Sequence, residues 1–316
     1  MAQTLSVYEA QTLITDTLDE VWEAEKPKSQ PAYEQFMNVM TMTRGEYADY
    51  ELAGFGQWDE REELEDVDYD EYSFGDKVTT KPKNWAKAFK VSEEAIEDLA
   101  DSGGEDRAKL ATYAEITRRM RRSQVWTIEQ ECADLLLNGT STATEYVLRD
   151  GAALFGSHSG LRSGAPSQSN VKTHASLSAN EIKTMTTSLD TQLDGAGDYI
   201  ADDGMNILVI SATDDFRAYE ILNSAGQVDT DLNNINSLKK TKYKIVVDKY
   251  LNVNAAAYSG YFLLREGMHS LRWFWRKKPV FARESSFDDI AMKFRGRFRG
   301  VRVAKDWRGT VGDNGS

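Results

Sequence analysis

The stretch from Glu105 to Asn138 constrains the fold of this chain more than any other. It contains neither Pro nor Gly and is rich in Ala, Leu, Glu, Arg and Gln, which favour helices. Ser102-Gly103-Gly104 breaks the chain before it, and Gly139 supplies a C-terminal stop. At about 1.5 Å per residue, the predicted helix is on the order of 50 Å long, which is more than a compact domain needs.

This helix is predicted to be half exposed. Its apolar stripe is thin, and no heptad seam is sustained along it, which argues against a long coiled coil. We expect such a helix to support a sheet on one side and to meet another molecule on the other. The stripe comprises Ile116, Met120, Ile128, Cys132 and Leu135, and the basic side chains of the first half are Arg107, Lys109, Arg118, Arg119, Arg121 and Arg122.

A second unusual stretch, from Glu46 to Asp76, is strongly acidic. Its only basic residue is Arg61, and aromatic residues are interleaved with its carboxylates, unlike in an ordinary disordered acidic tail. Residues 74–80 have the composition of a strand that returns from a hairpin. A long hairpin loop with aromatic anchors and no core of its own needs a partner surface.

The end of the chain carries the opposite charge. Between Arg272 and Arg308, basic residues clearly outnumber acidic ones. Residues 293–303 alternate as a strand, with Phe294 and Phe298 on one face and basic residues on the other. The alternation inverts after Gly300, which predicts a bulge there. The basic residues of that face are Lys293, Arg295, Arg297 and Arg299.

The remaining segments predict a mixture of helices and strands. Residues 1–45 predict a helix that ends near Glu25, followed by an extended piece. Ser92 is a candidate N-cap of a short helix, and residues 140–176 form a long polar loop. Residues 177–265 have a capping-box pattern at Ser178 and then alternating helical and strand signals, which describe a compact α/β domain.

The composition bounds the classes of protein. The chain has 316 residues and a formal net charge of -13, which disfavours coating nucleic acid. Its single cysteine, Cys132, excludes a disulfide within the chain and fits a reducing compartment. No signal peptide and no apolar run of about 20 residues are seen. These features predict a soluble product of the cytoplasm.

No catalytic constellation emerges from the motifs. The acidic run from Asp66 to Asp70 imitates the start of a calcium loop, but Glu71 and Lys77 occupy positions that need Gly and Glu. Ser157 and Ser159 flank His158, yet no strand-turn-helix elbow surrounds them, so a loop histidine is the better interpretation. We therefore expect no catalytic residue, no cofactor and no metal.

Seven short pieces, taken in their order and spacing, point to one family. They are Phe74-Gly75-Asp76-Lys77, Leu154-Phe155-Gly156-Ser157-His158, Leu208-Val209-Ile210-Ser211, Ile221-Leu222-Asn223-Ser224, Tyr261-Phe262-Leu263-Leu264-Arg265, and Arg299-Gly300-Val301-Arg302 with Trp307-Arg308-Gly309. In these pieces the chain resembles the Hong Kong 97 type major capsid protein of tailed bacteriophages, and more closely the Mu-type major head subunit family. The resemblance covers the chain from about residue 45 onward.

The resemblance implies an α+β capsid fold and a name for each part. The hairpin would be the E-loop that overlies a neighbouring subunit, and the axial domain would meet its copies at the centres of pentamers and hexamers. The parts are an N-terminal arm (1–45), the E-loop hairpin (46–90), a peripheral domain (91–150) with a spine helix (105–138), an extended loop (151–176), the axial domain (177–268) and return strands of the peripheral domain (269–316).

The function implied is assembly, not catalysis. The chain would form an icosahedral shell around double-stranded DNA without sequence-specific contact, as part of the virion, after assembly in the host cytoplasm. Expected partners are copies of itself, a separate scaffolding protein, a portal and a decoration protein, with no membrane. One alternative is an encapsulin-like nanocompartment shell of the same fold, and another is a nucleic-acid-binding protein that uses the C-terminal arginines.

The charges predict how copies meet. The acidic hairpin of one copy can lie on a basic surface of the next in a head-to-tail arrangement. The predicted acidic contact residues are Trp58, Asp59, Glu60, Glu62, Glu63, Glu65, Asp66, Asp68, Tyr69 and Asp70. The predicted basic partner surface comprises Arg118, Arg119, Arg122, Arg276, Lys277, Arg295, Arg297 and Arg299.

Overall fold

The structure is a computed structural model, and it describes residues 6–25, 27, 30–52, 60–61, 74–101, 107–160, 165–173, 175–200, 204–226, 235–241, 243–252, 260–286 and 291–313. The helices are α1 (Val7–Ala24), α2 (Ala32–Phe36), α3 (Glu93–Asp101), α4 (Arg107–Leu137), α5 (Ala179–Asp190) and α6 (Asp215–Asn223), with 3-10 helices η1 (Ser237–Lys240) and η2 (Lys249–Asn252). The strands are β1 (Asn38–Thr41), β2 (Tyr47–Leu52), β3 (Phe74–Thr80), β4 (Lys83–Ser92), β5 (Ser157–His158), β6 (Gln168–Ser169), β7 (Val171–Lys172), β8 (Asn206–Ile210), β9 (Tyr243–Val247), β10 (Phe262–Arg265), β11 (Leu271–Ser286), β12 (Ala291–Ala304) and β13 (Thr310–Asp313).

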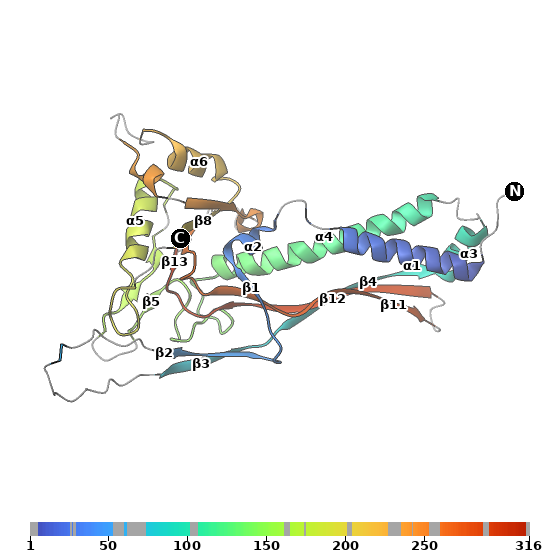
Figure 1. The fold of residues 1–316 in the computed structure, drawn as a ribbon, viewed down its shortest axis with the longest axis horizontal. Coiled ribbons are helices and arrows are strands. Elements are labelled where there is room, and N and C mark those ends of the chain that lie inside the picture. Colours follow the sequence, from blue (N-terminus) through green and yellow to red (C-terminus); the bar gives the residue numbers. More distant parts are fainter. Residues whose placement is uncertain are drawn as a thin grey trace.

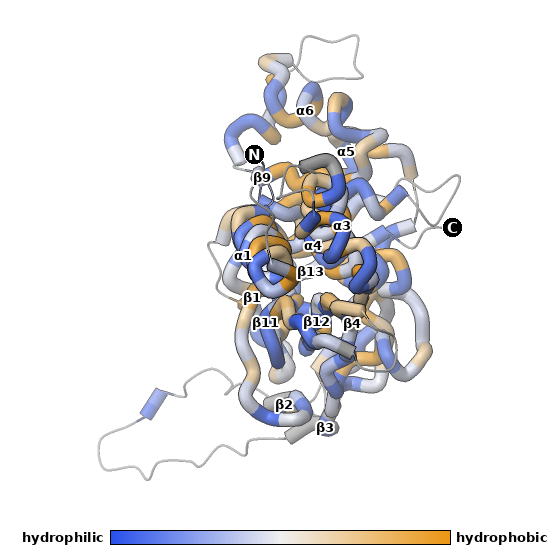
Figure 2. The backbone as a smooth tube through the Cα atoms, turned by 90° about the vertical axis from the view of Figure 1, so that its right-hand side faces the viewer, coloured by the Kyte–Doolittle hydropathy of each residue, from blue (hydrophilic) through white to orange (hydrophobic). Residues whose placement is uncertain are grey.

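The molecule is elongated (Figure 1). Its described residues form two two-stranded sheets, β2-β3 and β5-β6, and two larger sheets. The first, here called the peripheral sheet, has the strand order β1-β11-β12-β4, and the second, the axial sheet, has the order β7-β13-β10-β8-β9. In the end-on view, α1 and α4 lie on one side of the peripheral sheet and the hairpin β2–β3 lies on the other (Figure 2). The peripheral sheet therefore has a helix face and a hairpin face.

The predicted long helix is confirmed as α4, but its buried side differs from the predicted stripe. Ile116 is exposed, whereas Ala114, Thr117 and Gln124 are buried. Small and polar side chains let the first half of α4 lie close to α1, and the Thr117 hydroxyl is satisfied by the carbonyl of Tyr113 at 3.0 Å. Buried small or polar residues such as Ala114, Thr117 and Gln124 do not appear in a pattern of large apolar residues, so the sequence does not reveal this side of the helix.

The second half of α4 supports both sheets at once. Ile128, Cys132 and Leu136 are buried in one cluster with Trp273 of the peripheral sheet and Phe262 of the axial sheet. This shared core fixes the axial sheet relative to the long helix, since burying apolar surface is the main favourable term in folding.

Strand β12 confirms the predicted alternation but not the predicted bulge. Phe294 and Phe298 are buried, and the pairing of β12 with β4 runs without a break through Gly300. The extra residues lie instead in the partner strand β11, between Trp275 and Val280. The hydrophobic alternation of β12 inverts after Gly300 because the hairpin β2–β3 covers the face that carries Val301 and Val303.

The axial sheet is covered on both faces. Leu208 and Ile210 pack with α5 and α6, whereas Ile207 and Val209 face the cluster that contains α4. The axial segment thus forms three layers, in agreement with the predicted α/β character of residues 177–265.

The N-terminal segment packs on the peripheral sheet. Ser6 and Glu9 form a capping box at the start of α1, and Trp22 near its end stacks on Phe281 of β11 with ring centroids 5.1 Å apart. The predicted extended piece after Glu25 is partly wrong, because α2 begins directly after Pro31. Pro31 is the N-cap of α2, a position at which a proline interrupts no intrahelical hydrogen bond.

Candidate inter-subunit surfaces

The base of the hairpin β2–β3 is fixed on the peripheral sheet. Tyr47 stacks on Phe274 with ring centroids 4.6 Å apart, and it packs against a small apolar cluster that contains Met42, Val301 and Val303. These valines continue the face of β12 that carries the arginines further along the strand. The hairpin therefore covers one end of the hairpin face and leaves the rest of that face uncovered by described residues.

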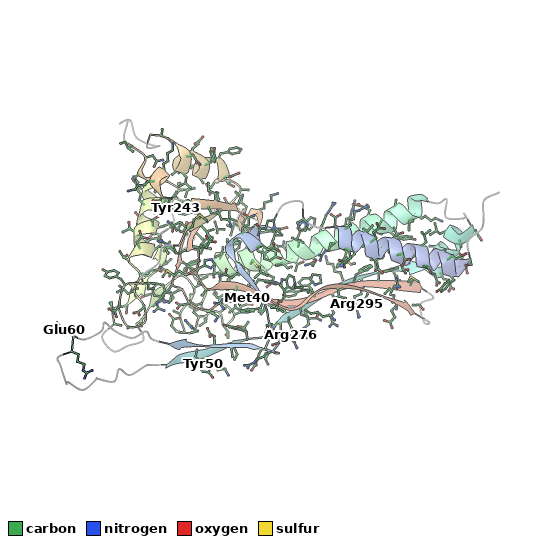
Figure 3. All side chains as sticks on the ribbon, in the orientation of Figure 1. Met40, Tyr50, Glu60, Tyr243, Arg276 and Arg295 are labelled. Atoms are coloured by element: carbon green, nitrogen blue, oxygen red, sulfur yellow. The ribbon has the colours of Figure 1, made fainter. Side chains whose placement is uncertain are left out.

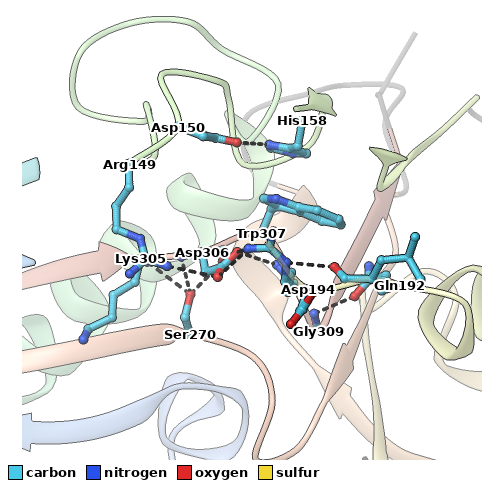
Figure 4. A network of polar contacts seen from close by, with 12 residues as sticks. Arg149, Asp150, His158, Gln192, Asp194, Ser270, Lys305, Asp306, Trp307 and Gly309 are labelled. Atoms are coloured by element: carbon cyan, nitrogen blue, oxygen red, sulfur yellow. Dashed lines mark hydrogen bonds and ion pairs between the residues drawn. The ribbon is translucent and has the colours of Figure 1, made fainter. Parts of the chain in front are cut away.

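A polar network ties the base of the hairpin to Arg149 and to residues near the end of the chain. Figure 4 shows Arg149, Lys305 and Asp306 of this network. The Arg149 guanidinium donates to the Asp49 carboxylate at 3.2 Å and to the Tyr50 carbonyl at 2.9 Å. Its other nitrogen donates to Asp306 at 3.0 Å, and Lys305 pairs with Asp49 at 3.1 Å. Because several links join the hairpin to the chain end, its base should be stiff.

His158 is a structural residue of the same region. Its Nδ1 lies 2.5 Å from an Asp150 oxygen, and its ring stacks on Trp307 with centroids 4.6 Å apart. Burial raises the pKa of Asp150, but the hydrogen bond and charge of His158 outweigh it and lower that pKa below its usual value. Both nitrogens of the ring have partners, since Nε2 lies 3.3 Å from the Asn170 oxygen.

Two further findings concern sites of other kinds. None of the described helices combines the length and apolar character needed to cross a membrane. Among the described residues, no group of three or more His, Cys, Asp and Glu side chains is arranged to hold a metal ion.

The uncovered part of the hairpin face is basic. Arg295, Arg297 and Arg299 point away from the buried phenylalanines of β12, and the neighbouring positions on β4 are the small residues Ala88 and Ala86 and the polar Asn84. Lys277 lies directly opposite Arg299 across β11 and β12. Like charges at directly opposite positions of a sheet destabilise it unless an anion lies between them. Figure 3 marks Arg276 and Arg295 along this sheet.

Four arginines of β11 and β12 each have an unsatisfied guanidinium nitrogen. The Nε atoms of Arg272, Arg276, Arg297 and Arg299 are buried and have no hydrogen-bond partner among the described residues. A buried donor without an acceptor costs free energy, about 1–3 kcal/mol for a neutral group and more for a charged one. Four such donors lie on the two adjacent strands β11 and β12. Arg272 belongs to the basic stretch 272–308 that the sequence marks, but it is not among the residues predicted for the partner surface.

The helix arginines are in a different situation. Arg122 pairs with Glu25 at 2.7 Å, Arg119 pairs with Glu115 at 3.0 Å, and Arg118 lies 3.5 Å from the same carboxylate. They belong to α4, on the helix face of the peripheral sheet. The structure thus separates the predicted basic residues into two sets that do not form one surface. The helix set, on α4, comprises Arg118, Arg119 and Arg122, and the sheet set, on β11 and β12, comprises Arg276, Lys277, Arg295, Arg297 and Arg299.

The acidic residues of the hairpin are mostly outside the described part of the chain. Glu60 is described and is exposed (Figure 3). The other predicted acidic contact residues, Trp58, Asp59, Glu62, Glu63, Glu65, Asp66, Asp68, Tyr69 and Asp70, lie outside the described residues.

Comparisons with known proteins identify the family. The profile of the phage capsid protein family matches residues 76–312. Among solved structures, the capsid of the cyanophage P-SCSP1u superposes with a TM-score of 0.53 at 8% identity, over 92% of this chain and 90% of that chain. The capsid of the native GTA particle superposes with a TM-score of 0.53 at 13% identity, over 91% of each chain. The mature capsid of bacteriophage PhiM1 superposes with a TM-score of 0.52 at 9% identity, over 91% of this chain and 88% of that chain. A search of curated proteins found no match.

The family profile spans most of the sequence, and the chain therefore belongs to the phage capsid protein family. It is a bacteriophage major capsid protein with the Hong Kong 97 type fold, a structural component of an icosahedral shell. The resemblance in fold and function that the sequence suggested is confirmed. The closer likeness to the Mu-type subunit stays a prediction.

Proposed function

We propose that this chain is the major head protein of a tailed bacteriophage, which assembles as pentamers and hexamers around double-stranded DNA. The observation that carries the proposal is the family match over residues 76–312 together with the capsid fold of nearly the whole chain. In this role the protein has no enzymatic activity, and its work is done by contacts between copies. The Mu-type head subunits are the branch in which we place it.

The contact we propose between copies joins the acidic hairpin of one subunit to the sheet set of the next. Three observations support it: the unpartnered Nε atoms on β11 and β12, the opposition of Lys277 and Arg299, and the excess of carboxylates in residues 46–76. The helix set is not part of this contact, because its arginines already have carboxylate partners within the chain. The head-to-tail geometry lets every copy give one hairpin and receive another.

The energy of this contact comes mainly from apolar burial. Exposed ion pairs contribute only about 0–1 kcal/mol each, and salt screens them. Aromatic residues near the hairpin, among them the exposed Tyr50, can bury far more area. The charges then select the partner and set the register, while many modest contacts keep assembly correctable.

Further partners follow from the same role. We propose a separate scaffolding protein, a portal and a decoration protein, with assembly in the host cytoplasm. The DNA inside would be held without sequence-specific contact, and the net charge of -13 supports a wall that does not grip phosphate. A nanocompartment shell with protein cargo is the weaker alternative, because the matching family is one of phage capsid proteins.

Electron microscopy of the purified protein tests the proposed assembly. We expect closed shells of uniform diameter that contain pentamers and hexamers, at protein concentrations that allow association. A protein that stays monomeric over a wide range of concentration and salt, with or without a scaffolding protein, would contradict the proposal. Shells that carry protein cargo instead of DNA when isolated from the host would favour the nanocompartment.

A further inference from the structure

Helix α6 exposes aromatic side chains that its own fold does not use. Ala218, Ile221 and Leu222 are buried against the axial sheet. On the opposite side of the helix, Phe216 is 83% exposed and Tyr219 is 62% exposed. The two residues are three positions apart and so lie next to each other on the helix surface. Their pattern is that of a contact surface and not of a core.

A second exposed apolar patch lies elsewhere on the axial segment. Tyr199 is 75% exposed, and Met205, in the chain connection that precedes β8, is 37% exposed. Tyr199 forms a bridge with Leu193, shortly after the end of α5. The Met205 carbonyl accepts from the amide of Glu266 at 2.9 Å. We call Phe216 and Tyr219 the α6 patch, and Tyr199 and Met205 the lower patch.

The two patches lie at opposite ends of α5. At the N-terminal end, Arg217 of α6 donates to the carbonyl of Leu177. At the C-terminal end, Arg265 pairs with Asp190 and donates to the carbonyl of Gly204, the residue before Met205. The 12 residues of α5 span about 18 Å. A single copy therefore cannot bring its own two patches together.

Two different apolar patches on one chain suit a heterologous contact, in which each copy uses one patch toward each neighbour. Two aromatic side chains bury roughly 300–500 Å² together. A stable dimer needs about 800 Å² from each partner. The α6 patch is thus too small to hold a dimer alone, and it suits one part of a larger interface that is closed by a ring.

From this arrangement we infer that the α6 patch of one copy packs on the lower patch of the next copy around a pentamer or hexamer. The occupant is a second copy of this chain, and the inference rests on the proposed function. Phe216 and Tyr219 act as the anchors, since exposed aromatic side chains are typical of the residues that dominate binding energy.

Assembly of substituted proteins tests the anchors. The combined substitution Phe216→Ser and Tyr219→Ser should raise the protein concentration needed for shell formation about tenfold or more. The matched control is Tyr8→Ser, which removes an equally exposed aromatic residue from α1 and should leave that concentration unchanged. Assembly of the α6 variant at the concentration of the unsubstituted protein would overturn the inference.

Cross-linking tests which patch receives the anchors. In a Cys132→Ser background, which has no other cysteine, the pair Phe216→Cys and Tyr199→Cys should give disulfide-linked ladders up to pentamers and hexamers under mild oxidation. Phe216→Cys alone should give none. Dimers from that single cysteine would show a two-fold contact instead, and shells without any ladder from the pair would show that the patches do not meet. Failure of the unsubstituted chain to form shells would count against the proposed function and not against this pairing alone.

Discussion

The Arg302 guanidinium lies 2.7 Å from the Asp134 carboxylate and so ties strand β12 to helix α4. Another of its nitrogens donates to the carbonyl of Glu131 at 2.6 Å, and only 7% of the side chain is exposed. Burial lowers the pKa of Arg302, but the charges of Asp134 and Glu131 outweigh it and raise that pKa. The strand that carries the sheet set is thereby held by the long helix on its other face.

Replacing Arg302 with Met should destabilise the subunit. Removing one partner of a buried pair leaves its carboxylates without compensation, at a cost of several kcal/mol when they are fully buried. Asp134 and Glu131 keep some access to water, so we expect a loss of about 2–3 kcal/mol. Urea unfolding of the subunit measures it. The control Arg119→Met, at an exposed position of α4, should change stability by less than about 0.5 kcal/mol. Equal effects of the two substitutions would contradict the structural role of Arg302.

Gly300 marks a close approach of two strands. A Cβ added there would lie 2.6 Å from a ring carbon of Trp273 and 3.0 Å from the Phe274 carbonyl oxygen. Gly300→Ala should therefore overpack the core and cost about 1–3 kcal/mol, measured as a lower unfolding temperature. Gly45→Ala is the control, because no atom lies within 4 Å of the added Cβ there. An unchanged unfolding temperature for Gly300→Ala would show that the core can relax around the methyl group.

Asp248 should make stability depend on pH. It is 1% exposed, one oxygen accepts from the Tyr250 amide at 2.9 Å, and the other has no partner among the described residues. Burial, with a smaller contribution from the charge of Glu129, raises its pKa to about 6. Because the folded state holds the proton more tightly than the unfolded state, stability falls as pH rises from about 4 to 6.

Asp248→Asn keeps the acceptor for Tyr250 and removes the charge. The variant should be more stable than the unsubstituted protein by about 2–3 kcal/mol at pH 7.5, and the difference should disappear near pH 4. Urea unfolding at both pH values, with Glu220→Gln as an exposed control, measures it. A difference that stays constant between the two pH values would contradict burial of an ionisable carboxylate.

Charge reversal should block shell formation without unfolding the subunit. We expect this for Glu62→Lys, Glu63→Lys, Glu65→Lys and Asp66→Lys together, and separately for Arg297→Glu with Arg299→Glu. Combining both sets should restore part of the assembly, since opposite charges then face each other again. Circular dichroism checks the fold, and electron microscopy counts the particles. Arg119→Glu, on the helix face, is the control and should still assemble. Intact shells from either reversed set would refute the proposed pairing.

The sequence predicts the long elements of this protein better than their surroundings. The helix over 105–138 and the alternation of β12 depend on local composition, and both are observed as α4 and β12. The bulge near Gly300 was placed in the wrong strand, because the inverted pattern reflects the hairpin over Val301 and Val303 and not an extra residue. A strand whose second face is covered by another element shows the same inverted alternation of polar and apolar residues as a strand with a bulge.

The candidate surfaces show the same limit. The sequence marks the basic residues, but only the fold separates Arg118, Arg119 and Arg122 from Arg297 and Arg299. Which cation already has a carboxylate partner depends on elements far apart in the chain, such as Glu25 beside Arg122. The sequence also does not predict the exposure of Phe216, because an aromatic residue in a helix is usually part of the core.

A high-resolution cryo-electron microscopy map of the assembled shell measures the proposed recognition between copies most directly. We predict that carboxylates from residues 59–71 of one subunit lie within about 4 Å of Arg276, Arg297 or Arg299 of its neighbour, the separation typical of an ion pair. A map in which residues 59–71 touch no neighbouring subunit, or in which the sheet set faces only solvent or DNA, would contradict it.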